Sequence, residues 1–77
     1  MPIRAYVLIN TQIGQTQKVV EELKKIPEVK RFDVIMGPYD IIVEVEVPHY
    51  EDISKLLLEK FQSIPAINHT MTCPVVS

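Results

Sequence analysis

The chain has 77 residues, of which 47% are hydrophobic and 23% are charged, and its formal net charge is −2. This length predicts one domain over residues 1–77, and the composition is typical of a folded chain and excludes a disordered one. The slightly acidic balance argues against direct binding of nucleic acid. A single cysteine, no secretory signal and no apolar run long enough to span a membrane predict a cytoplasmic protein without a disulfide or a membrane partner.

The first half of the chain predicts a strand, a helix and a second strand. Residues 3–10 place Ile3, Ala5, Val7 and Ile9 on one face and a mixed row that includes Leu8 on the other. Residues 15–26 carry apolar side chains at helical spacing before Pro27. Residues 28–36 predict a strand in which three side chains share one face: Phe32, Val34 and Met36. The Gly-Pro-Tyr-Asp stretch at residues 37–40 is a turn by composition.

The second half repeats this order. Residues 41–47 are the clearest strand: Ile41, Val43, Val45 and Val47 fall on one face, and Ile42, Glu44 and Glu46 fall on the other. Residues 50–64 predict a helix that ends at Pro65, and residues 68–77 predict a last strand. Because Pro74 cannot donate a hydrogen bond, this strand is expected at a sheet edge. The apolar stripe of the second helix is predicted to consist of Ile53, Leu57, Phe61 and Ile64, with Leu56 beside it.

The resulting order, β-α-β-β-α-β, is that of the ferredoxin-like split plait, an α+β fold. In this fold a four-stranded antiparallel sheet carries both helices on one face, and the other face stays bare. A domain this small gains stability when such a face is buried. We therefore expect sheet-to-sheet association of the dimeric α/β-barrel type.

Catalytic and metal sites find little support in the sequence. His69 and Cys73 would lie about 13 Å apart along a strand, which is too far for one zinc ion. Glu44 and Glu46 share a strand face, where a solvated or interface-facing edge is the simpler interpretation than an acid pair. Residues 41–47 also lack the aromatic platform of RNA-recognition folds. We expect no catalytic residues, no metal and no cofactor.

The turn at residues 37–40 is the most informative stretch. Backbone N–H groups around Gly37 could hold a carboxylate, and Asp40 could hold an ammonium group. A free amino acid carries both groups. The hydroxyls of Thr70 and Thr72 project from one strand face and would reach the turn across a subunit contact. The structural alternative is that the turn needs glycine for backbone freedom and Asp40 for a local cap.

Four features together resemble the ligand-binding RAM domain of the Lrp/AsnC (feast/famine) transcription regulators. They are Gly37-x-Tyr39-Asp40, the apolar run that follows it, Ile64-Pro65-x-Ile67 and Thr70-x-Thr72. The resemblance implies dimers that assemble into larger homo-oligomers, an amino-acid effector bound in a cleft between dimers, and an effect on transcription. It implies these ligand-binding residues: Gly37, Pro38, Tyr39, Asp40, Thr70 and Thr72.

The sequence departs from the full regulators at three points. The first strand begins at Ile3, which leaves no room for a helix-turn-helix, so a stand-alone domain without direct DNA contact is expected. Co-assembly with full-length Lrp/AsnC regulators is a further expectation. Ala66 replaces a more usual glycine, and Pro74 lies in the last strand. Two alternatives stay open: a small dimeric α/β-barrel enzyme, and an ACT-like amino-acid-binding domain that associates edge to edge.

Overall fold

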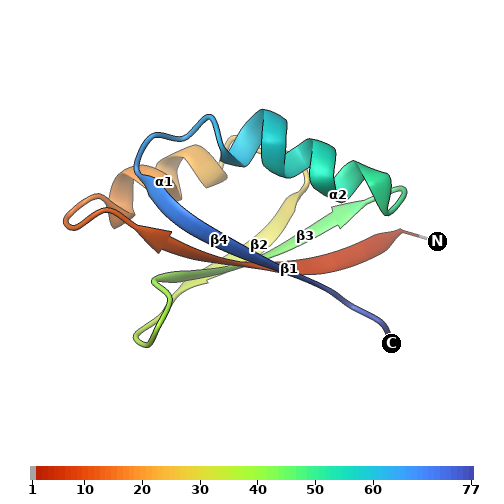
Figure 1. Ribbon diagram of the computed structural model, residues 1–77, viewed down its shortest axis with the longest axis horizontal. Coiled ribbons are helices and arrows are strands. Elements are labelled where there is room, and N and C mark those ends of the chain that lie inside the picture. The colour runs from red at the N-terminus through yellow and green to blue at the C-terminus, as the bar shows by residue number, and fades with distance from the viewer. Residues whose placement is uncertain (1) are drawn as a thin grey trace.

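The computed structural model describes residues 2–77 as a sheet covered by helices on one side (Figure 1). The elements in chain order are β1 (Ile3–Thr11), α1 (Thr16–Leu23), β2 (Val29–Val34), β3 (Ile41–Val47), α2 (Glu51–Leu56), the π-helical turn η1 (Leu57–Phe61) and β4 (Ile67–Pro74). The four strands form an antiparallel sheet in the order β2-β3-β1-β4. The predicted ferredoxin-like α+β fold is confirmed, and β4 lies at an edge as expected.

The core lies between the sheet and the helices because alternate side chains of the two central strands point the same way. Directly paired residues of β1 and β3 share a face, so their apolar rows form one continuous apolar surface under the helices. The helices contribute apolar side chains of their own to this core. The fully or almost fully buried side chains include Val7, Ile9, Val43 and Val45 from the strands, and Val19, Leu23, Leu56 and Phe61 from the helices.

The first helix is shorter than the sequence predicted. It ends at Leu23, so Lys24 and Lys25 lie beyond its last turn. Each lysine instead forms an ion pair of 3.1 Å with a glutamate three residues earlier, Glu21 and Glu22 respectively. These pairs are exposed, and exposed pairs of this kind contribute little to stability.

The second helix differs from the prediction in its phase. Its last turn is π-helical, and the Gln62 N–H donates to the Leu57 carbonyl at 2.8 Å, five residues back. In a regular α-helix, residues five apart differ by about 140° around the axis. The wider turn lets Leu56 and Phe61 both face the sheet, and Leu57, which the regular stripe placed inward, is only partly buried.

The second strand ends earlier than predicted. The Ile35 N–H donates to the Asp40 carbonyl at 2.8 Å and closes the β2–β3 loop just beyond Val34. Phe32 packs against the core, as expected for that face, but Val34 is 60% exposed and Met36 lies fully exposed in the loop. Phe32 and Val34 do share a face, because they pair with the buried Val43 and Ile41 of β3. The prediction is wrong for Met36, because the chain leaves the sheet after Val34.

Candidate functional site

Asp40 ties the β2–β3 loop to the end of β1. The Thr11 N–H donates to Asp40 Oδ2 at 2.8 Å, and the Thr11 hydroxyl lies 3.3 Å from the same oxygen. The Asp40 N–H donates to the Ile9 carbonyl at 2.9 Å. The hydroxyls of Thr11 and Thr16 are also 2.8 Å apart. The Asp40 carboxylate thus has a structural role, but it accepts from a residue 29 positions away and not from a neighbour in its own turn, as the local cap would require.

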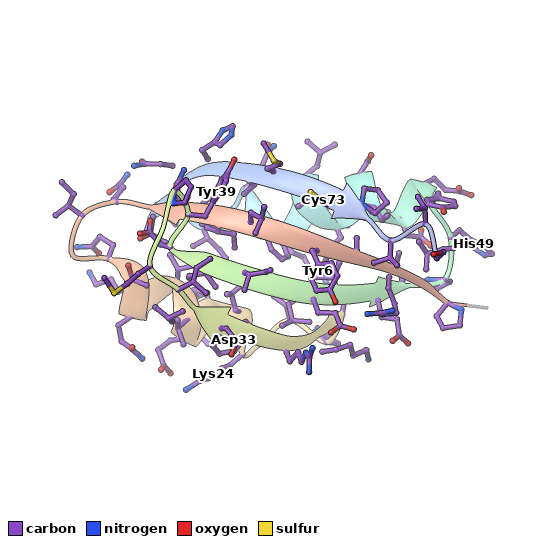
Figure 2. The ribbon with its side chains drawn as sticks, turned by 90° about the horizontal axis from the view of Figure 1, so that it is seen from below. Tyr6, Lys24, Asp33, Tyr39, His49 and Cys73 are labelled. Carbon is purple, nitrogen blue, oxygen red and sulfur yellow. The ribbon has the colours of Figure 1, made fainter. Side chains whose placement is uncertain are left out.

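Tyr39 reaches across the sheet to β4. Its hydroxyl donates to Met71 Sδ at 3.6 Å, and its ring stacks on that of His69 with centroids 6.5 Å apart and planes 21° from parallel. We call the sheet face opposite the helices the open face; Figure 2 looks onto it, with Tyr39 lying near β4. The loop and β4 therefore touch within one protomer, although β1 and β3 separate β4 from β2 in the sheet.

Thr70 and Thr72 lie on the opposite face from Tyr39. They pair with Ile9 and Val7, which are fully buried under the helices. Directly paired residues share a face, so both threonines point to the helix side at the edge of the sheet. The two groups of predicted site residues thus meet at the same edge strand but from its two sides.

Gly37 and Pro38 are exposed in the loop. Gly37 does not have a positive φ, and a Cβ built on it meets nothing within 4 Å. The expectation that this turn needs glycine for backbone freedom is wrong, because a residue before proline is held in the extended region, which any residue adopts. Among residues 2–77, positive φ occurs at Gly14, at 78°.

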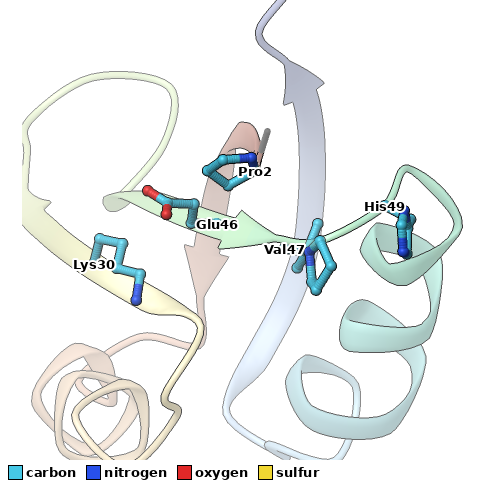
Figure 3. Close-up of a pocket in the computed structure, with 6 residues that line it drawn as sticks. Pro2, Lys30, Glu46, Val47 and His49 are labelled. Carbon is cyan, nitrogen blue, oxygen red and sulfur yellow. The ribbon is translucent and has the colours of Figure 1, made fainter.

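Two hollows lie in the surface, and one of them is lined by a predicted site residue. Thr70 lines an open hollow of about 470 Å³ beside the end of η1, together with Phe61, Gln62, Ile67, Asn68 and His69. Another hollow of about 450 Å³ lies near the start of β1, and its lining includes Lys30 and Glu46 of neighbouring strands and His49 (Figure 3). His49 and Tyr39 lie at opposite ends of the sheet (Figure 2), so the second hollow is separate from the predicted site.

The open face carries a charge network that the sequence did not reveal. Glu44 accepts from Arg4 Nε through one oxygen and pairs with Arg31 Nε through the other, each at 3.0 Å. Arg4 also donates to the Tyr6 hydroxyl at 3.2 Å, and its hydrogen bond to Glu44 raises the pKa of its guanidinium. The Glu44 side chain is only 14% exposed. It is therefore held by two arginines rather than freely solvated.

Apolar side chains lie next to this network. Leu8 is paired with Ile42 on one side and with Met71 on the other, and we call these three residues the apolar row. Met71 is 46% exposed. From the sequence, the open face could carry either the Tyr6/Leu8 row or its opposite, together with Ile42. The register puts Leu8 beside Ile42 and adds Met71 through the pairing of β4 with β1.

Residues 2–77 present neither a cluster of metal-binding side chains nor a helix that could span a membrane. These residues contain no group of three or more histidine, cysteine, aspartate or glutamate side chains placed to hold a metal ion. Within the same range no helix has both the length and the apolar character needed to cross a bilayer.

Known proteins resemble this chain over nearly its whole length. The family model described as the Lrp/AsnC ligand binding domain matches residues 4–77. An uncharacterized HTH-type transcriptional regulator of Pyrococcus abyssi is 33% identical over 75 residues, which make up 97% of this chain and 48% of the regulator. The chain thus spans about half the length of the curated relatives it matches.

Solved structures match the fold closely. The crystal structure of FFRP-DM1 is 35% identical with a TM-score of 0.91, and the match covers 96% of this chain and 99% of that one. The transcriptional regulator NMB0573 of Neisseria meningitidis, solved as a complex with L-Met, has a TM-score of 0.90 over 97% of this chain and 50% of its own. Its identity is 14%, so this likeness concerns the fold alone.

Proposed function

The chain belongs to the Lrp/AsnC ligand-binding domain family, and from this premise we propose that it senses an amino acid and thereby modulates transcription. The family is regulatory, which favours a binding module over an enzyme. The family match over residues 4–77 carries the proposal. It also favours this family over the ACT-like alternative, which shares the fold and the class of ligand.

The amino-acid class is supported from two sides. A regulator with the same fold binds L-Met. In this chain, the β2–β3 loop offers an aromatic side chain beside exposed backbone, which suits a small zwitterion better than a large or purely apolar ligand. In the proposed site, Gly37 and Pro38 form the exposed rim, Tyr39 forms a wall and Asp40 stabilises the loop.

The proposed site includes residues from more than one protomer. Tyr39 faces the open side of the sheet, whereas Thr70 and Thr72 face the helix side. One protomer therefore supplies either the loop or the hydroxyls to a given pocket, and a neighbouring copy supplies the other set. This arrangement links effector binding to assembly, because the pocket exists only where copies meet.

We further propose that copies first associate through the open face. The apolar row gives this face a patch to bury, and the network of Arg4, Glu44 and Arg31 balances much of its own charge within the protomer. Burial of this network leaves few lone charges to be desolvated. The dimers would then form larger homo-oligomers, alone or with full-length Lrp/AsnC regulators in the cytoplasm, and those regulators rather than this domain would contact DNA.

Calorimetric titration with each proteinogenic amino acid tests the sensing role. We expect at least one to release or absorb heat above the buffer blank, and the solution mass to change when that amino acid is present. Light scattering after size-exclusion chromatography gives the mass with and without ligand. No heat and no change in mass with any of the amino acids would contradict the proposal.

A further inference from the structure

We propose that Asp40 is a positioning residue rather than an effector ligand. Its carboxylate holds the β2–β3 loop against the end of β1, and this holds Tyr39 across the open face. The role of Asp40 in ligand binding rests on the proposed function above. The positioning itself does not, and it can be measured without any ligand.

The hydrogen bonds of Asp40 are directed inward. Its Oδ2 accepts from the N–H of Thr11, and its own N–H and carbonyl bond to Ile9 and Ile35. Thr11 is 8% exposed, and a buried backbone N–H needs a partner. Within residues 2–77, no buried side-chain nitrogen or oxygen lacks a hydrogen-bond partner. The carboxylate therefore fills a structural need that exists before any ligand arrives.

The network extends to the start of α1. A hydroxyl donates one hydrogen bond, so if Thr11 donates to Asp40, the Thr16 hydroxyl donates to Thr11. Thr16 is the first residue of α1. The loop, the end of β1 and the helix start are thus joined by one chain of hydrogen bonds that begins at the carboxylate.

Tyr39 depends on this network for its position. Its own contacts are weak: a thioether is a poor acceptor for its hydroxyl, and the His69 ring lies at 6.5 Å, near the far limit of stacking. The bond from the Thr11 N–H to the Asp40 carboxylate is charge-assisted and shorter, at 2.8 Å. The residue beside Tyr39 therefore fixes the backbone from which the ring projects.

Two substitutions separate positioning from direct ligand contact. A carboxylate that binds an ammonium group needs its negative charge, whereas one that accepts from Thr11 needs only an oxygen. Asp40→Asn keeps an acceptor oxygen and removes the charge, and Asp40→Ala removes both. Positioning predicts that D40N behaves like the wild type and D40A does not; direct contact predicts that both lose binding.

The first readout is NMR of the free protein. In the wild type we expect a cross-peak between the Tyr39 ring and the Met71 methyl group, and a coupling across the hydrogen bond from the Thr11 amide nitrogen to the Asp40 carboxylate carbon. D40N should keep the cross-peak. D40A should lose it, and exchange of the Thr11 amide hydrogen should accelerate on the order of tenfold or more. The coupling is measured in the wild type, so it tests whether the hydrogen bond from Thr11 to Asp40 exists even if D40A does not fold.

The second readout is affinity for L-methionine as the probe. We expect D40N to bind within about threefold of the wild type and D40A to bind on the order of tenfold more weakly. Glu51→Gln and Glu51→Ala are the matched controls, because Glu51 is an exposed acid of α2 on the helix side of the sheet, and neither should change the cross-peak.

Three results would overturn the proposal: no coupling in the wild type, a cross-peak that survives in D40A, or equal loss of L-methionine binding in D40N and D40A with the cross-peak intact. If L-methionine binds no variant, the wild type included, that result counts against the choice of effector. The NMR data then decide the positioning role alone.

Discussion

The fold of a single protomer does not require glycine at residue 37. Its φ is not positive, and a Cβ there would meet nothing within 4 Å. We expect Gly37→Ala to keep the fold and to raise the free energy of unfolding by up to about 0.4–1 kcal/mol, because alanine restricts the unfolded chain. If the effector approaches the backbone here, the added methyl group weakens its binding, which calorimetric titration measures.

Gly14 provides the matched control for this substitution. Its φ of 78° lies in the left-handed region, so Gly14→Ala should lower the free energy of unfolding by about 1–2 kcal/mol. Urea denaturation of both variants makes the comparison. A loss of stability in G37A equal to that in G14A would show that the protomer itself needs a glycine at residue 37.

Glu28 and Lys60 form an ion pair that predicts a specific response to acid. Lys60 Nζ lies 2.9 and 3.1 Å from the two Glu28 oxygens, and this hydrogen bond is the main cause that lowers the pKa of Glu28 below its ordinary value of 4.5. Because the pKa of Glu28 is lower in the folded protein than in the unfolded chain, its ionised form stabilises the fold at any pH above the ordinary pKa of a glutamate. This stabilisation disappears as the pH falls through the lowered pKa.

The substitution Lys60→Met should therefore reduce stability at neutral pH and make the loss in acid shallower. Urea midpoints measured from neutral pH down through the range of carboxyl titration test this. Lys18→Met is the control, since Lys18 is an exposed lysine of α1. An unchanged pH profile in K60M would show that the pair contributes nothing to folding.

At the scale of the elements, helical spacing identified the second helix but not its last turn. The predicted stripe contained Leu57 and Phe61, with Leu56 beside it. The structure buries Leu56, the last residue of α2, together with Phe61, and Leu57 is only partly buried. The hydrogen bond that spans five residues replaces a regular one because packing both Leu56 and Phe61 on the sheet stabilises the fold more than one regular α-helical turn does. This gain depends on the sheet below the helix, which no local pattern contains.

Two substitutions in the same turn should differ strongly in their effect on the free energy of unfolding. Phe61→Ala should cost about 3–5 kcal/mol, since Phe61 is fully buried and its loss leaves a cavity. Leu58→Ala, in the same turn but 63% exposed, should change stability by less than about 0.5 kcal/mol. Urea denaturation compares them, and similar costs for both would contradict the burial of Phe61.

At the scale of the whole molecule, both helices lie on one side of the sheet, and the described part of the protomer places no helix over the open face (Figure 1). If copies associate through it, as we propose, an acid in the middle of the apolar row should separate them. We expect Leu8→Asp to lower the solution mass to that of one protomer while the circular dichroism spectrum stays that of the folded domain. Size-exclusion chromatography with light scattering measures the mass.

Ser54→Asp is the control for this test, because Ser54 is exposed on α2, on the other side of the sheet. It adds the same charge and should leave the mass unchanged. A wild-type protein that runs as a single protomer at all concentrations would contradict the proposed association.

The sequence by itself determined the order of the elements, the fold and the family. The apolar row on one face of residues 41–47, helical spacing on either side and prolines at the helix ends are local features, and neighbouring residues suffice to reveal them. The motifs Gly37-x-Tyr39-Asp40 and Thr70-x-Thr72 pointed to the family for the same reason. They also indicated which loop and which strand to study, although the roles of these residues stay predictions.

Only the tertiary structure decided how these motifs lie relative to one another. The side on which Thr70 points depends on its pairing with Ile9, and the partner of the Asp40 carboxylate is Thr11, 29 residues earlier in the chain. Register between strands and hydrogen bonds across loops depend on residues far apart in sequence, and a shift of one residue reverses every side chain. For this reason the sequence placed Tyr39 and the hydroxyls in one site, and the fold placed them on the two sides of one strand.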